Sequence, residues 1–268
     1  MQVLEAIFRW IHVVAGIMWI GHLYFFNFVN GPFQGTLDGE TKKKVNPELL
    51  PRALFWFRWG AAWTWGSGIL LLALVFYHGW KGGNLFDAGA DVSSAAAGIM
   101  ILVNLLAFLA YDVLVKQEFA KNLTTLFVVG VILTAVVALL DIYVGGFGYR
   151  GMVIHTGAMF GTIMAFNVWF RIWPAQQKII AAVKAGTPPD ASLVALAGAR
   201  SKHNTYLSVP LVWMMLNAHT TKFASILGLS GEAGRIEAVL WLTLMTAIGW
   251  WFCTMFYRQS TKDSTKAF

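Results

Sequence analysis

Long apolar runs separated by short polar segments dominate the chain. A helix needs roughly 20 apolar residues to cross a hydrocarbon core of about 30 Å, and this criterion predicts about seven spanning helices. They are expected at residues 3–28, 53–78, 92–115, 123–144, 151–173, 206–220 and 236–257. The sixth is the shortest, and Pro210 falls in its first turns, where proline is tolerated. The pattern therefore predicts an all-α integral membrane protein in which residues 1–268 form a single transmembrane domain.

The positive charges along the chain predict its orientation. Fourteen Lys and Arg residues lie at the first, third and fifth connections and in the C-terminal tail, against five at the opposite ends of the helices; Arg58, inside the second helix, completes the 20. Positive residues favour the cytoplasmic side, so the N-terminus is expected outside and the C-terminus in the cytoplasm. Residues 174–204 are predicted to be an amphipathic cytoplasmic loop, with short surface helices at 176–184 and 191–199.

Composition excludes several classes of protein. The chain is 57% hydrophobic and only 12% charged, whereas soluble proteins carry about 25% charged residues. A net charge of +7 does not indicate nucleic-acid binding here, because the basic residues lie in short connections. Cys253 is the one cysteine, so the chain has neither an internal disulfide nor a CxxCH site for a covalently attached haem. Residues 1–9 lack a basic start and a small-residue cleavage site, so the first helix is expected to be retained.

Six histidines provide the candidate chemistry, because each lies within or at the rim of a predicted span. Histidine is costly in hydrocarbon, and an intramembrane histidine therefore indicates a functional site by default. Neutral imidazole is a common axial ligand of haem iron. A rise of about 1.5 Å per residue sorts the histidines by depth. The outer group is His12, His78, His155 and His219, and the inner group is His22 and His203.

These depths predict a b-type haem in the outer group. Such a haem needs two imidazoles at one depth on facing helices. Iron ligation is favoured for His12 and His155, with His219 as a further candidate ligand. The inner pair, His22 and His203, would hold a second haem and so complete an electron path across the bilayer. One haem or two therefore remains open.

Simpler interpretations stand beside the haem hypothesis. His78 is expected to be an interfacial residue. His22 has the alternative of a hydrogen bond to a neighbouring helix, and His203 that of a polar helix start or a contact to a haem propionate. Arg58, near the cytoplasmic end of the second helix, is predicted to pair with a propionate or an anionic substrate. Its alternative is snorkelling toward the headgroups.

Four segments resemble the membrane domain of the bacterial urate hydroxylases, the membrane-bound urate oxidase family. The resemblance covers nearly the whole chain, and the segments occur in the family's order. The most specific is RSKHNTYLSVP at 200–210, followed by Asn217-Ala218-His219. The others are RWIHVVAGIMWIG at 9–21, WTWGSG at 63–68 and HTGAMFGTIM at 155–164.

The resemblance implies an oxidoreductase of the bacterial inner membrane that hydroxylates urate and passes electrons to a cytochrome c. The family's eighth helix leads to a C-terminal cytochrome c domain, and this chain stops after its seventh predicted helix. Its electrons are therefore expected to reach a separate cytochrome c or a quinone. The chain also departs from the family. Residues 31–52 form a shorter connection without histidine, Phe55 and Gly60 stand where the family has a histidine and a glutamate, and His22 is an addition.

Two other functions remain open beside a haem b-binding oxidoreductase. The first is a non-catalytic membrane subunit of a respiratory or photosynthetic electron-transfer complex. The second is a transporter of a metal or a small anion, with histidines along its path. The expected partners are membrane lipid, a cytochrome c or quinone, and either a larger membrane complex or further copies of the chain; nucleic acid is not among them.

Overall fold

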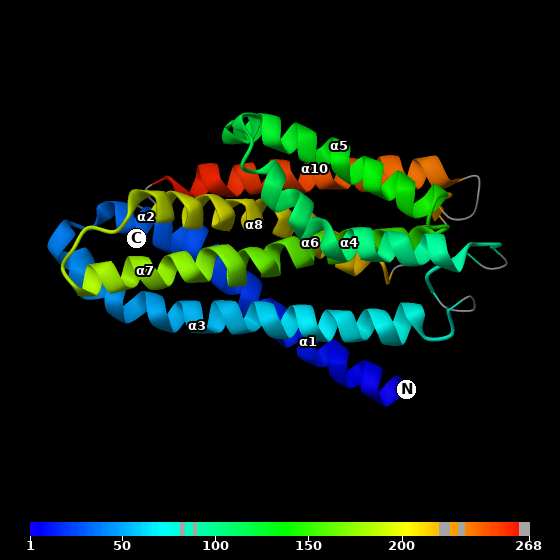
Figure 1. Cartoon of the computed structure of the whole chain (residues 1–268), viewed down its shortest axis with the longest axis horizontal. Helices are drawn as coiled ribbons and strands as arrows, with labels where there is room; N and C mark the ends of the chain where they lie inside the picture. Colours follow the sequence, from blue (N-terminus) through cyan, green and yellow to red (C-terminus); the bar gives the residue numbers. More distant parts are fainter. Residues whose placement is uncertain (81–83, 88–89, 220–225, 230–233, 263–268) are drawn as a thin grey trace. The chain divides into compact units, whose positions relative to one another are not determined.

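A computed structural model describes the chain except for residues 81–83, 88–89, 220–225, 230–233 and 263–268 (Figure 1). Its longer α-helices are α1 (Gln2–Tyr24), α3 (Gly39–Leu72), α4 (Ser94–Leu114), α5 (Leu123–Tyr143), α6 (Tyr149–Asn167), α7 (Trp173–Lys184), α8 (Ala191–Asn217) and α10 (Arg235–Ser260). The shorter elements are the π-helices η1 (Phe25–Asn30), η2 (Ala73–Tyr77) and η5 (Val168–Ile172), the helix α2 (Gly31–Thr36) and the 3₁₀-helix η4 (Glu118–Lys121). The described part is therefore all-helical, apart from one isolated bridge between Phe86 and Phe147.

Six helical stretches in the described residues are long and apolar enough to cross a membrane. They are Gln2–Thr36, Gly39–Tyr77, Ser94–Leu114, Leu123–Tyr143, Tyr149–Lys184 and Arg235–Ser260. Each contains one of the predicted spans, or nearly all of it. The remaining predicted span, 206–220, lies largely in α8, a helix of 27 residues that is not among the six. The chain is thus a multi-pass, all-α membrane protein.

The connection predicted at residues 31–52 is wrong, because most of it is helical. The first helix continues through η1 and α2 to Thr36, and α3 begins at Gly39. Asp38 ends one helix and starts the next: its carboxylate accepts hydrogen bonds from the Thr41 backbone N–H at 2.9 Å and from the Thr41 hydroxyl at 2.6 Å. A side-chain oxygen placed in this way satisfies a free N–H group at the start of a helix. Hydropathy marks only the apolar part of such a helix.

The helices predicted at 176–184 and 191–199 are present, but each is part of a longer helical stretch. The first amphipathic stretch belongs to α7, which follows η5 without a break. The second is the beginning of α8, which runs on to Asn217. The predicted break at 186–190 is confirmed: Gly186 has φ of +72°, a conformation that glycine adopts without strain. His203 therefore lies in the interior of a helix, and the prediction that a helix begins there does not hold.

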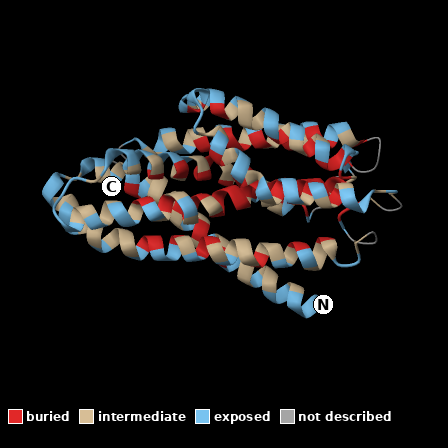
Figure 2. Ribbon diagram, viewed as in Figure 1, coloured by how far each residue is buried: buried red, intermediate tan, exposed pale blue. Residues whose placement is uncertain are grey.

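Large apolar side chains cover the outer face of several predicted spans, and α4 also buries polar side chains. On α4 the exposed large side chains are Ile99, Leu102, Val103, Leu106, Leu109 and Val113. The buried residues of the same helix are Ala97, Met100, Asn104, Phe108 and Asp112. Figure 2 shows exposed and buried positions on several other helices, whereas α6 is buried along most of its length. The exposed face of α4 is apolar, and it suits a helix whose outer face is solvated by lipid.

The contacts group the described residues into two compact units. Unit 1 comprises residues 1–5, 69–163 and 209–250, and unit 2 comprises residues 6–68, 164–208 and 251–268. Each unit is described by itself below. Unit 1 contains His78, His155 and His219, and unit 2 contains His12, His22 and His203.

Candidate functional site

In unit 2, His12 lies against a seat of small residues on α3. Its Nδ1 is 2.9 Å from the carbonyl oxygen of Thr64 and 3.2 Å from the hydroxyl of Ser67. Gly68 makes room for the ring, because a Cβ at that position would lie 3.0 Å from His12 Cε1. The WTWGSG segment thus forms the part of the α3 surface against which His12 packs.

The seat belongs to a close packing of α1 against α3. A Cβ on Gly60 would lie 3.0 Å from the backbone nitrogen of Trp19, and a Cβ on Gly16 would lie 3.8 Å from the Thr64 methyl group. As residue numbers rise on α1 they fall on α3, so the two helices run antiparallel. This close packing explains why residue 60 is a glycine. The family resemblance leads one to expect a glutamate at this position, and its side chain would collide with the backbone of α1.

The hydrogen bonds of His12 determine which ring nitrogen is available. A carbonyl oxygen only accepts, so Nδ1 carries the hydrogen and donates it to Thr64. Nε2 of the neutral ring then holds a lone pair, and the described structure gives it no partner. A metal-binding histidine typically donates its other N–H to a carbonyl or carboxylate, which fixes the ring orientation. His12 therefore has the hydrogen-bond arrangement that is typical of metal-binding histidines.

An apolar groove of about 520 Å³ runs beside this seat, between α1 and α3. It contains no charged side chain, and four tryptophans contribute to its walls. It is lined by Trp10, Ile11, Val14, Ala15, Met18, Phe55, Trp56, Trp59, Gly60 and Trp63. One end lies at Trp63, whose carbonyl accepts a hydrogen bond from Ser67 at 2.6 Å. An apolar molecule from the membrane can therefore approach close to the His12 seat.

In unit 1, His155 is enclosed on every side. Its side chain is 0% exposed. Nδ1 lies 2.7 Å from the carbonyl of Gly151, and Nε2 lies 2.8 Å from the hydroxyl of Tyr77. Three aromatic rings surround the imidazole, with centroid distances of 4.8 Å to Phe147, 5.7 Å to Tyr77 and 6.1 Å to Phe76.

His155 has the same tautomer as His12 but a different use for Nε2. Because Nδ1 donates to the Gly151 carbonyl, Nε2 accepts the hydrogen of the Tyr77 hydroxyl. Both ring nitrogens are therefore engaged. His155 fits an iron site only if the Tyr77 hydroxyl moves away. Tyr77 ends the π-helix η2, a type of distortion that is frequent at functional sites.

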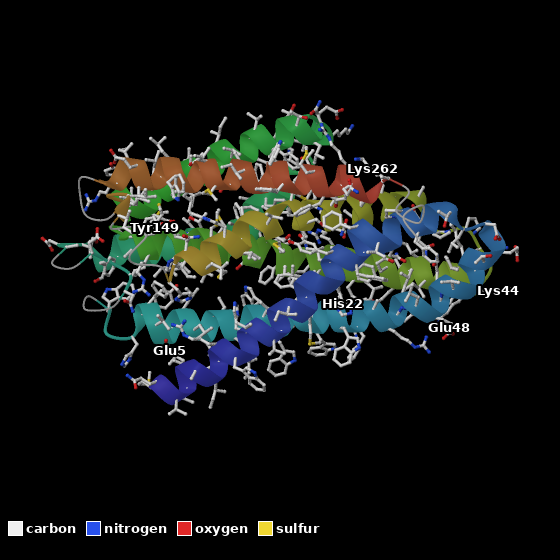
Figure 3. All side chains as sticks on the ribbon, turned by 180° about the vertical axis from the view of Figure 1, so that it is seen from behind. Glu5, His22, Lys44, Glu48, Tyr149 and Lys262 are labelled. Atoms are coloured by element: carbon white, nitrogen blue, oxygen red, sulfur yellow. The ribbon has the colours of Figure 1, made fainter. Side chains whose placement is uncertain are left out.

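His22 lies on α1, where Figure 3 marks it, and its Nδ1 donates to the carbonyl of Met18 at 2.7 Å. The side of this segment that meets α8 is a different one: Tyr24 bonds Ser208 at 3.1 Å and Asn27 donates to Ser201 at 2.8 Å. At about 100° per residue, His22 points more than about 100° away from that side. The structure therefore does not bring His22 toward the helix that carries His203.

The remaining histidines differ in exposure. His203 is half-buried within α8, next to Asn204, which is fully buried and accepts a hydrogen bond from Asn167 at 2.9 Å. His219 is exposed just beyond the end of α8, as is His78 just beyond η2. Among the described residues, no group of three or more His, Cys, Asp or Glu side chains could hold a bare metal ion.

Arg58 packs among aromatic rings. Its guanidinium carbon is 3.9 Å from the ring centroid of Trp173, 5.8 Å from that of Phe55 and 6.0 Å from that of Trp169. Such cation–π contacts stabilise an arginine without a carboxylate. Its buried Nε has no hydrogen-bond partner in the described part of the chain. An anion at this place would satisfy the nitrogen.

The sequence alone did not predict two sets of residues that contact the candidate histidines. Tyr77 is the direct partner of His155, yet 78 positions separate them. Thr64, Ser67 and Gly68 were recognised as part of a motif but not as the seat of His12. In the sequence, such a seat is indicated only by a hydroxyl-bearing residue and a glycine about one turn apart on an apolar helix.

The fold and these buried polar sites define a class: a multi-pass α-helical membrane protein with histidines held inside its helical units. The family described as Urate oxidase N-terminal matches residues 31–228, which is 198 of 268 residues. The chain therefore belongs to the Urate oxidase N-terminal family. The match includes the segments at 63–68, 155–164 and 200–210 and omits the one at 9–21, which carries His12. No curated protein and no solved structure matches the chain.

Proposed function

We propose that this urate oxidase-related membrane protein is an oxidoreductase that binds haem b, with Nε2 of His12 as an iron ligand. The observation that carries the proposal is the seat of His12, in which Nδ1–H donates to the Thr64 carbonyl and leaves the Nε2 lone pair available. When bound, haem supplies one-electron chemistry that protein side chains lack. Family membership supports an oxidative role.

His155 remains the candidate ligand in unit 1. Its Nδ1 is already fixed by Gly151, so only the Tyr77 hydroxyl competes for Nε2. Arg58 would serve an anionic group, a haem propionate or an anionic substrate, through the nitrogen that now lacks a partner. His203 and His219 are proposed only as secondary contacts to the cofactor. A second haem held by His22 is not part of the proposal.

The proposed electron partners are a separate cytochrome c or a quinone, in the inner membrane of a bacterium. The groove between α1 and α3 supports a quinone, because its wholly apolar lining beside the His12 seat suits an isoprenoid carrier dissolved in the bilayer. Trp63 lies at the end of the groove nearest Ser67 and His12.

The test begins with the spectrum of the purified full-length protein. A Soret band, and a pyridine haemochrome of the b type after extraction, are expected. Addition of urate under air is expected to change the haem spectrum if the protein is an enzyme. Haem without a response to urate would favour a non-catalytic subunit of an electron-transfer complex. Absence of haem after expression with added haem precursor would refute the proposal and favour a transporter.

A further inference from the structure

Unit 1 contains a carboxyl group that the proposed function does not use. Asp141, near the end of α5, is 0% exposed, and so is Asn104 in the middle of α4. The amide of Asn104 donates to Asp141 Oδ1 at 2.7 Å and to the carbonyl of Met100 at 2.9 Å. Both partners of the amide nitrogen are acceptors, so the orientation of the amide group is fixed.

Two oxygens of this pair lack partners in the described structure. They are Asn104 Oδ1 and Asp141 Oδ2, and both are buried. Both are acceptors, so neither can satisfy the other while Asp141 is charged. A proton on Asp141 Oδ2 would supply the missing donor. The acid and the amide would then exchange two hydrogen bonds in a ring, which leaves neither oxygen without a partner.

The surroundings of Asp141 favour the neutral acid. An isolated carboxylate is strongly disfavoured in a medium of low dielectric constant, and such a group takes up a proton instead. The turn after α5 covers the site, because the backbone N–H of Phe147 donates to the Asp141 carbonyl at 2.9 Å and a Cβ on Gly145 would lie 3.0 Å from the Met100 side chain. The one hydrogen bond described for the Asp141 carboxylate comes from Asn104.

Asp112, on the same helix as Asn104, shows the contrasting case. It is also buried, at 7% exposed, but Lys116 lies 2.7 Å from its carboxylate. An ion pair of this kind holds the carboxylate in its charged form. The chain therefore has two buried aspartates in neighbouring helices, one with a cation and one with an amide.

We infer that Asp141 and Asn104 form a proton-binding site inside the membrane domain, in which Asp141 Oδ2 carries an exchangeable proton donated to Asn104 Oδ1. The site does not depend on haem. Tyr77 of η2 is a titratable group within electrostatic range of Asp141, and its hydroxyl bonds His155 of α6. Asp112 of α4 is paired with Lys116, which follows that helix, so their charges neutralise each other. Loss of the proton would therefore place a negative charge close to the His155 cage.

The test is infrared spectroscopy on the full-length protein in lipid nanodiscs at neutral pH. The wild type is expected to show the carbonyl-stretch band of a protonated carboxylic acid, and the band is expected to shift in D₂O because the proton exchanges. Asp141→Asn should remove the band completely. Asp112→Asn is the matched control, and it should leave the band unchanged because Asp112 is ionised.

Further variants keep the test decisive if Asp141→Asn fails to fold. Asp141→Glu retains an acid and should move the band without abolishing it, and Asn104→Leu removes the acceptor and should shift the band to the frequency of a free acid. A wild-type spectrum without such a band would overturn the inference. So would a band that Asp112→Asn removes, or one that D₂O never shifts.

Discussion

His12 and His155 look alike in sequence, since each lies in an apolar run of a predicted span. The two sites differ, however, in the hydrogen-bond partner of Nε2. In both, Nδ1–H donates to a backbone carbonyl. In unit 2 the ring of His12 rests on small residues and its Nε2 is available. In unit 1 the Nε2 of His155 is used by Tyr77, inside a cage of aromatic rings. The difference teaches that the partner of the second ring nitrogen decides whether a buried histidine is available to a ligand.

The largest effect on stability is expected from removing the His155 cage. His155→Ala deletes a fully buried ring and leaves the Tyr77 hydroxyl and the Gly151 carbonyl without a partner. Cavity and hydrogen-bond losses together should cost about 3 kcal/mol or more. Tyr77→Phe removes one hydrogen bond and should cost only about 1–2 kcal/mol. Thermal unfolding in detergent measures both. Equal melting temperatures for His155→Ala and the wild type would show that the cage does not stabilise unit 1.

Tyr77→Phe also tests His155 as a ligand. The variant frees Nε2 of His155, so haem content should stay the same or rise if His155 binds iron. Haem per protein, measured as the pyridine haemochrome, decides the point. A lower haem content in a folded Tyr77→Phe protein would mean that Tyr77 itself supports the cofactor and that its hydroxyl does not compete with iron.

The packing of α1 on α3 is the second target. Gly60→Ala places a Cβ 3.0 Å from the backbone nitrogen of Trp19, and backbone cannot yield as a side chain does. Overpacking of this kind should cost about 1–3 kcal/mol. Gly66→Ala is the matched control on the same helix, because nothing lies within 4 Å of its added Cβ; alanine's helix propensity should make it neutral or stabilising by up to about 1 kcal/mol. Identical melting temperatures for the two variants would contradict the described packing.

Gly68→Ala should alter the His12 seat with little effect on folding. The added Cβ would lie 3.0 Å from His12 Cε1, and the ring is able to turn away. The turned ring would lose its bond to the Thr64 carbonyl, so haem content should fall severalfold while the melting temperature changes little. Gly66→Ala again serves as control, with haem content unchanged. If Gly68→Ala kept all its haem, the ligand would have to be sought away from this seat.

The smallest effect is expected at Asp190, before α8. Hydrogen bonds from the Ser192 hydroxyl and backbone lower the pKa of Asp190 below its ordinary value of 3.8. A lowered pKa in the folded state means that the stabilising contribution is complete above the ordinary value and is lost as the pH falls through the folded-state pKa. Amide hydrogen exchange at 192–194 should therefore become faster relative to the rest of α8 below about pH 4. Asp190→Asn keeps a capping oxygen that does not titrate, so in that variant the pH dependence should vanish.

The sequence predicted the spans well and the connections poorly, for a physical reason. Apolar length reports where lipid solvates a helix, and each of the six long apolar helices contains one such run. Hydropathy does not report where a helix ends. The first part of α3 is polar yet helical, supported by the Asp38 cap and by an ion pair between Glu48 and Arg52 at 2.7 Å.

The candidate histidines were visible in the sequence, but the properties that distinguish them were not. The partner of His155 lies 78 residues away on another helix, and no local pattern marks Tyr77 as its donor. The seat of His12 likewise depends on the close approach of α1 and α3, which glycines permit. Asp141 lies near the end of α5, a position from which its sequence context alone suggests access to water, yet it is completely buried beneath the turn that ends at Phe147.

The most direct test of the central claim, that Nε2 of His12 binds haem iron, is the haem content of purified His12→Gly protein with and without imidazole. The variant opens a space above the Thr64–Gly68 seat in which free imidazole can take the place of the lost ring. His12→Gly is expected to lose its haem, and added imidazole is expected to restore the Soret band. A folded His12→Gly protein with the same haem content and spectrum as the wild type would contradict the claim.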